Sequence, residues 1–230
     1  MFFFNPTYWL FMAPALLFTL AAQIYVSSTY KKWSQVRARS QLSGAEAAQR
    51  LIRYGGLYDV EIEPVRGNLT DHYDPRKKIL RLSQGVYRGN SVASLAIAAH
   101  ELGHAMQDQE GYAPLRFRSL LVPAVNIGSY LGWILILIGL FLGMTELAWL
   151  GVAIFSGGAI FALATIPVEL NASSRAKELL ANAGIISGEQ ERQGVNAVLN
   201  AAALTYVAAL FTAIVQLLYW ASLVAGGRRR

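Results

Sequence analysis

The chain has 230 residues, of which 54% are hydrophobic and 15% are charged. Soluble domains are typically about 45–50% apolar and about 25% charged, so the composition argues against an ordinary soluble globule, and disordered chains contain even fewer apolar residues. The absence of cysteine excludes disulfides, thiolate metal ligands and a catalytic thiol. In a chain this apolar, we interpret the net charge of +6 as one that orients membrane spans and contacts anionic lipid headgroups, and we expect no nucleic-acid partner.

Four apolar stretches predict membrane-spanning helices, since about 20 predominantly apolar residues cross the hydrocarbon core of a bilayer. They cover residues 6–26, 122–144, 147–166 and 198–225. The first contains no charged side chain and lacks the basic start and cleavage pattern of a signal peptide. Only Thr145 and Glu146 separate the second from the third, which predicts a tight helical hairpin. The fold class predicted is therefore a mainly α, multi-pass membrane protein.

The distribution of basic residues predicts the orientation of these spans. Of the 20 Lys and Arg residues, 14 lie in segment 27–119 and three lie in segment 167–197. With four spans, both segments lie on one face, which the positive-inside rule places in the cytoplasm of a bacterial inner membrane. Segment 167–197 is expected to form one cytoplasmic helix. The last three, Arg228–Arg230, would then lie on the opposite side. Either this tail is a minor exception to the rule, or the fourth segment does not fully cross.

Segment 27–119 reads as a small α+β unit. Ser43 and Glu46 form a capping box for a helix that Gly55-Gly56 ends. Alternating apolar and acidic residues over 57–65 predict one strand, and residues 78–83 predict a second strand after a turn-rich stretch. Ser91 is expected to cap a further helix that ends near residue 111.

That last helix contains the sequence His100-Glu101-Leu102-Gly103-His104, which has the HExxH spacing. Residues i and i+4 share one helical face, so the two imidazoles can bind the same zinc ion. Glu101 can then reach a zinc-bound water and act as the general base of peptide hydrolysis. The alternative is a chance pentapeptide on an amphipathic helix, but two of the chain's three histidines lie in it. We predict one catalytic zinc ion per chain.

A catalytic zinc ion needs a third protein ligand and one open position. Glu169 is the candidate, since it follows Pro167, which ends the third span or begins a new helix, and emerges on the same membrane face as the histidines. The small residues Ala172, Ser173 and Ala176 on the same helix face would let it approach the HExxH helix closely. The alternative is an interfacial glutamate favoured by a helix N-terminus.

Three stretches, HELGHAMQ, LTDHYDPRKKILRLSQGVY and PVELNASSRA, resemble the bacterial YugP-type family of membrane neutral zinc metallopeptidases. The resemblance covers nearly the whole chain. More distantly, the arrangement is similar to the HtpX and CAAX-prenyl-protease gluzincins, in which HExxH precedes two spans and a later glutamate completes the zinc site. The resemblance implies a zincin-like cytoplasmic unit, with His100, His104 and Glu169 as zinc ligands and Glu101 as the general base.

The chain departs from these patterns beside the third ligand. It has Ser173 at the last position of the E-x-x-A-D motif, and Asn171 where the YugP-type pattern has aspartate. A carboxylate in this region would orient a ligand imidazole. The resemblance therefore implies that Asn171 or Ser173 takes over that contact.

The second predicted strand lies where relatives of this fold carry an edge strand along the cleft. A substrate peptide can add to such an edge through main-chain hydrogen bonds, at Ile79, Leu80, Arg81 and Leu82. The alternative is an ordinary edge strand protected by its basic side chains.

Three further residues are candidate donors to the oxyanion of the tetrahedral intermediate. His72 and Tyr73 just precede the second strand, and their alternative is a polar loop pair. Arg175 is the third, and its alternative is an orientation or lipid-contacting residue beside a span.

The sequence thus predicts a membrane-integrated zinc metalloendopeptidase that acts on membrane or membrane-associated proteins. One alternative is a catalytically silent zinc-containing scaffold or adaptor, whose structural site would need a fourth ligand, with His72 as the remaining imidazole. Another is a zinc carrier, which the few polar residues of the spans, Gln23, Asn126 and Gln216, disfavour.

Overall fold

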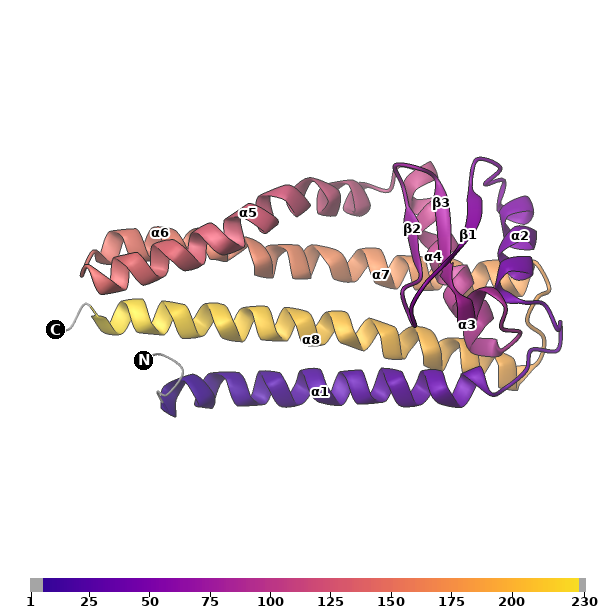
Figure 1. The fold of residues 1–230 in the computed structure, drawn as a ribbon, viewed down its shortest axis with the longest axis horizontal. Coiled ribbons are helices and arrows are strands. Elements are labelled where there is room, and N and C mark those ends of the chain that lie inside the picture. Colours follow the sequence, from indigo (N-terminus) through magenta and orange to yellow (C-terminus); the bar gives the residue numbers. More distant parts are fainter. Residues whose placement is uncertain (1–5, 228–230) are drawn as a thin grey trace. The chain divides into compact units, whose positions relative to one another are not determined.

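The computed structural model describes residues 6–227, so the Arg228–Arg230 tail lies outside the described residues. Helices dominate the described chain, and a small sheet lies in its N-terminal half (Figure 1). The elements are, in order, α1 (Pro6–Ser34), α2 (Gly44–Gly55), β1 (Glu61–Val65), β2 (His72–Asp74), β3 (Ile79–Ser83), α3 (Gln84–Tyr87), α4 (Val92–Gln109), α5 (Ala113–Phe141), α6 (Thr145–Phe155), α7 (Gly157–Asn182) and α8 (Glu189–Gly227).

The chain forms two compact units. The first comprises the described residues of Met1–Gln23, Arg116–Pro167 and Thr205–Arg230, and the second comprises Ile24–Leu115 and Val168–Leu204. Four helical stretches within residues 6–227 are long and apolar enough to cross a membrane: Pro6–Ser34, Ala113–Phe141, Thr145–Asn182 and Glu189–Gly226. The predicted class, a mainly helical membrane protein with a small α+β unit, is confirmed.

Helix boundaries differ from the expectation in three places. Helix α5 begins at Ala113, ahead of the predicted start of the second span. Helix α7 continues through Pro167, which neither ends nor begins a helix, and the interruption lies instead at Ser156. Segment 167–197, predicted as one helix, contains the end of α7, a connection and the start of α8.

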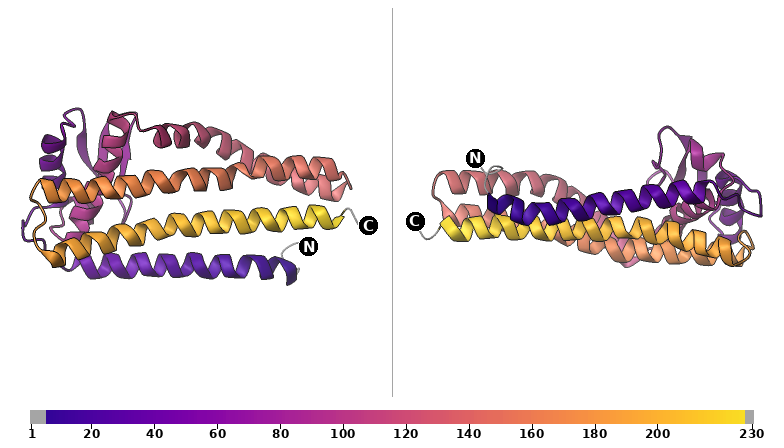
Figure 2. Two further views of the ribbon diagram at one scale, coloured as in Figure 1. Left: turned by 180° about the vertical axis from the view of Figure 1, so that it is seen from behind. Right: turned by 90° about the horizontal axis from the view of Figure 1, so that it is seen from below.

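The first unit is held together by close helix contacts. Helices α5 and α6 form the predicted hairpin, and a Cβ on Gly132 would lie 2.8 Å from the carbonyl oxygen of Gly151. Such small residues let apolar helices pack backbone to backbone. Helices α1 and α8 lie side by side in both views of Figure 2, with 3.2 Å between the hydroxyls of Thr19 and Thr212.

The second unit contains a three-stranded sheet with the order β1-β3-β2. Strand β3 pairs in parallel with β1 and antiparallel with β2. The Asp74 carboxylate closes the β2–β3 hairpin by accepting hydrogen bonds from the backbone N–H groups of Arg76 and Lys77. The prediction of an edge strand at residues 79–82 is therefore wrong, because β3 is the central strand, and β2, expected as a turn, is an edge.

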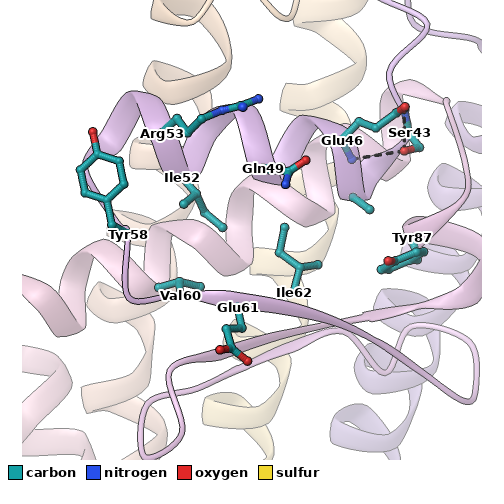
Figure 3. A pocket seen from close by; sticks show the side chains of 11 residues that line it. Ser43, Glu46, Gln49, Ile52, Arg53, Tyr58, Val60, Glu61, Ile62 and Tyr87 are labelled. Carbon is teal, nitrogen blue, oxygen red and sulfur yellow. Dashed lines mark hydrogen bonds between the residues drawn. The ribbon is translucent and has the colours of Figure 1, made fainter.

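Helices α2 and α4 of this unit begin and end close to the predicted positions. The Ser43–Glu46 capping box is present (Figure 3), and Gly56 follows α2 with a left-handed φ of 68° that favours glycine. The Ser91 hydroxyl accepts a hydrogen bond from the Ser94 N–H at the start of α4. Fully buried side chains from α2, β3, α4 and α7 form the core of this unit. They include Leu51, Leu80, Leu82, Leu95, Ala99, Leu102, Ala176 and Leu180.

Candidate metal centre

Two imidazoles project from one face of α4, one helical turn apart. The rings of His100 and His104 meet edge to face, with 4.9 Å between their centroids. Their side chains are 12% and 14% exposed, whereas Ala96, Ala99 and Leu102 on the same helix are fully buried in the core. Core packing of α4 therefore fixes the direction in which the two imidazoles point.

Glu169 brings a carboxylate from α7 to both imidazoles. Its Oε2 lies 3.3 Å from Nε2 of His100 and 3.4 Å from Nε2 of His104, and its side chain is only 4% exposed. Potential ligand atoms of these three residues all lie within 4.8 Å of one another. Two atoms bound to a tetrahedral zinc ion at about 2.0–2.1 Å lie about 3.3–3.4 Å apart. The donor set and the spacing of this trio both fit zinc.

The outer nitrogen of each imidazole has its own hydrogen-bond partner. Nδ1 of His100 lies 3.2 Å from the Ser173 hydroxyl, and Nδ1 of His104 lies 3.0 Å from Oε1 of Gln107. Asn171 reaches His104 only indirectly, since its Oδ1 accepts a 2.9 Å hydrogen bond from Nε2 of Gln107. Sequence reasoning missed Gln107, although its position three residues after His104, on the same helix face, was the signal that could have identified it.

The sheet positions Glu101. Its Oε2 accepts a 3.1 Å hydrogen bond from the backbone N–H of Tyr73 on the edge strand β2.

The charges of Glu101 and Glu169 affect the protonation of His104. Burial lowers the pKa of His104, but the hydrogen bond from its imidazole to Glu169 and the charges of Glu101 and Glu169 outweigh burial, so the net pKa is raised. A proton therefore competes with a metal ion for this imidazole more strongly than for an ordinary histidine.

Residues 8–225 match the sequence profile of the family described as "Putative neutral zinc metallopeptidase". The chain belongs to this family. It is also 47% identical over 214 residues to the Bacillus subtilis (strain 168) protein "Putative membrane protease YugP", a match that covers 93% of this chain and 95% of that protein. No solved structure matches the chain. The resemblance read from the sequence is thereby confirmed, and the chain is a membrane protein of a zinc metallopeptidase family.

In this metallopeptidase, α4 and α7 approach each other closely because of Gly103, inside the HExxH motif. A Cβ at residue 103 would lie 2.5 Å from the carbonyl oxygen of Ala172, closer than real Cβ contacts. Ala172 and Ala176 on the facing side of α7 are fully buried. The predicted small residues of α7 thus have a counterpart on α4, and together they bring Glu169 within reach of the imidazoles.

The side chains of the three predicted oxyanion donors have hydrogen-bond partners outside the trio. The exposed His72 ring contacts the carbonyl oxygen of Thr70, with 2.8 Å from its Nδ1. The Tyr73 hydroxyl donates a 3.0 Å hydrogen bond to Asp108, one turn beyond His104, and burial together with that carboxylate raises the pKa of Tyr73. The Arg175 guanidinium donates two hydrogen bonds, 2.6 and 2.7 Å long, to Glu110.

A cavity of about 720 Å³ lies between α2 and β1, outside the trio (Figure 3). Its apolar lining includes Ile52, Tyr58, Ile62 and Tyr87. It contains none of the residues predicted for catalysis or metal binding, so the metal centre and this cavity are separate features of the second unit.

Proposed function

We propose that this protein is a multi-pass membrane zinc endopeptidase that binds one zinc ion through His100, His104 and Glu169. The observation that carries the proposal is the position of the Glu169 carboxylate, 3.3 and 3.4 Å from the two imidazole nitrogens. Three protein donors would leave one coordination position open to water, as in catalytic zinc sites. His72, the imidazole that a closed structural site would require, contacts the Thr70 carbonyl oxygen instead.

Zinc, when bound, supplies the Lewis acidity that makes a coordinated water nucleophilic near neutral pH. Glu101 would accept a proton from the attacking water and later deliver it to the leaving amine. The backbone N–H of Tyr73 holds the Glu101 carboxylate in place for both transfers. Ser173 and Gln107 contact the outer nitrogens of His100 and His104, so the inner nitrogens keep facing Glu169.

Strand β2, rather than β3, is the edge we propose for substrate pairing. It is an outer strand of the sheet, and the Tyr73 N–H points away from β3 towards Glu101. A substrate segment that paired with β2 in an extended conformation would therefore run past the proposed base. This arrangement supports an endopeptidase, because an extended chain can pass through the site without presenting a terminus.

We propose cytoplasmic catalysis on membrane-associated proteins, with spans at residues 6–26, 122–144, 147–166 and 198–225 of a bacterial inner membrane. All but three of the 20 Lys and Arg residues lie in segments 27–119 and 167–197, which the positive-inside rule assigns to the cytoplasm. Because Glu169 follows an apolar stretch closely in the sequence, the site suits substrates held at the bilayer.

The chain's lack of cysteine provides a test of sidedness. A single cysteine at the exposed Arg66 (Arg66→Cys) should react with a membrane-impermeant maleimide only after the inner membrane is permeabilised. Labelling of intact spheroplasts would place segment 27–119 on the outer side and overturn the proposed orientation.

Metal removal tests the activity itself. Full-length protein in detergent should cleave casein or a reconstituted membrane protein, and 1,10-phenanthroline should reduce the rate to that of a protein-free control. We expect one equivalent of zinc per chain to restore cleavage. Cleavage that persists without metal would refute the zinc mechanism, whereas a zinc-loaded protein that cleaves nothing would favour the scaffold alternative.

A further inference from the structure

We infer that a chain of four side chains fixes the proton of His104 on Nδ1 and so reserves Nε2 for the metal. We call this the positioning chain, and it consists of Gln107, Asn171, Arg175 and Glu110. The inference deepens the proposed function, on which it rests, because it explains how one ligand of that zinc site is kept ready to bind.

The orientation of the Gln107 amide is fixed by the backbone. Its Nε2 lies 2.8 Å from the carbonyl oxygen of Val168, which can only accept a hydrogen bond, so the amide nitrogen must occupy that position. Oε1 therefore faces His104, 3.0 Å from Nδ1, and it too can only accept. Since Gln107 is fully buried, water cannot replace either partner. Nδ1 of His104 must carry the hydrogen.

Asn171 reinforces this polarity from the other side. Its Oδ1 accepts hydrogen bonds from Nε2 of Gln107, at 2.9 Å, and from Nε of Arg175, at 2.7 Å. A guanidinium has no acceptor, so the atom of Asn171 that faces Arg175 is its oxygen. The same oxygen then requires the nitrogen of Gln107 to point towards it.

An ion pair anchors the outer end of the positioning chain. Arg175 donates two parallel hydrogen bonds to Glu110, and this contact lowers the pKa of Glu110. Bidentate pairing holds the guanidinium in one plane and leaves its Nε directed at Asn171. The Glu110 side chain is 51% exposed, so a surface group is connected to a zinc ligand through three intervening side chains.

The two imidazoles are thus held in different ways. The Ser173 hydroxyl beside His100 can donate or accept, so this contact alone does not select a tautomer. Oε1 of Gln107, which lies beside Nδ1 of His104, can only accept a hydrogen bond. In a zinc-binding histidine, the hydrogen bond of one ring nitrogen determines which form the other takes. Zinc binding through His104 should therefore depend on the positioning chain.

Zinc affinity of the full-length protein, measured by competition with a chromophoric chelator, tests this dependence. Gln107→Met should bind zinc about 10–100-fold more weakly than wild type, because it removes the acceptor for Nδ1 of His104. Asn171→Leu leaves the Val168 contact of Gln107 in place and should weaken zinc binding less than Gln107→Met does. Asn171→Asp keeps an oxygen that accepts both hydrogen bonds and should retain wild-type affinity. Gln109→Met, which removes an exposed glutamine on the same helix, is the matched control and should leave the zinc affinity at the wild-type value.

A spectroscopic measurement separates positioning from a merely structural role. The chain has three histidines, so histidine ¹⁵N labelling of the zinc-loaded protein gives a simple spectrum. In wild type and Asn171→Asp, His104 should show a protonated Nδ1 and a metal-bound Nε2, and in Gln107→Met, which removes the acceptor at Nδ1, this signature should be lost without a change in the unfolding temperature of the zinc-free protein. Unchanged affinity and tautomer in Gln107→Met would overturn the inference.

The outcomes also distinguish this inference from the proposed function. If wild type binds zinc with this dependence but cleaves no substrate, the peptidase proposal fails and the positioning chain stands. If Gln107→Met binds zinc like wild type while wild type cleaves substrate, the positioning chain fails and the peptidase stands. If wild type binds no zinc, both are overturned.

Discussion

Glu101→Gln is expected to abolish peptide hydrolysis while leaving zinc bound. The substituted amide keeps the size of the side chain and an oxygen that can accept the hydrogen bond from the Tyr73 N–H. It cannot accept a proton from water, and a positioned general base contributes about 10²–10⁴-fold to such a reaction. Because His100, His104 and Glu169 are unchanged, the zinc content should stay at the wild-type value. We expect kcat to fall by at least about 10²-fold.

The measurement pairs zinc content with cleavage of the same preparation. Glu61→Gln, which makes the same chemical change at an exposed position of β1, should retain full activity and controls for purification losses. Turnover at the wild-type rate in purified Glu101→Gln, with contaminating proteases excluded, would show that another group accepts the proton. Loss of zinc together with activity would instead show that Glu101 contributes to metal binding.

Local signals in the sequence predicted the local structure around this site. The capping box at Ser43 and the cap at Ser91 involve partners only three residues away, so each is complete within its own stretch of sequence. The HExxH spacing likewise needs only helical geometry to place His100 and His104 on one face. Glu169 was predicted from the topology, because two apolar hairpin helices return the chain to the membrane face on which the two histidines lie.

Features that depend on contacts between distant segments were not predictable. Strand β2 is three residues long, too short for an alternating pattern, and it exists because the Asp74 turn folds it back onto β3. Pro167 disfavours a helix locally, yet α7 continues through it. The importance of Gly103 appears only when Ala172 of α7 packs against it. In each case packing across the fold decided between conformations that the local sequence left open.

Glu169→Ala is expected to remove stoichiometric zinc from the protein. Two histidines at i and i+4 remain, but a catalytic zinc site needs three protein donors. Loss of one donor should weaken affinity by more than the roughly 10–100-fold typical of losing a residue that only hydrogen-bonds to a ligand. The zinc-free protein should not be destabilised in proportion, because a carboxylate that is 4% exposed already carries a desolvation cost. Inductively coupled plasma mass spectrometry of the dialysed protein measures the metal, and loss of cleavage should accompany the loss of zinc.

Thermal unfolding with and without zinc separates ligation from folding. A ligand that binds only the native state at 100 times its Kd stabilises it by about 2.7 kcal/mol, so zinc should raise the unfolding temperature of wild type. At the same zinc concentration Glu169→Ala should show little of this increase, whereas Glu178→Ala, which removes an exposed carboxylate from the same helix, should show all of it. Because the comparison uses the zinc-dependent increment, a general weakening of α7 by alanine cancels out. A full increment in Glu169→Ala would mean that the carboxylate beside the two imidazoles is an ion-pair partner and not a zinc ligand, and the third donor would have to come from elsewhere in the chain.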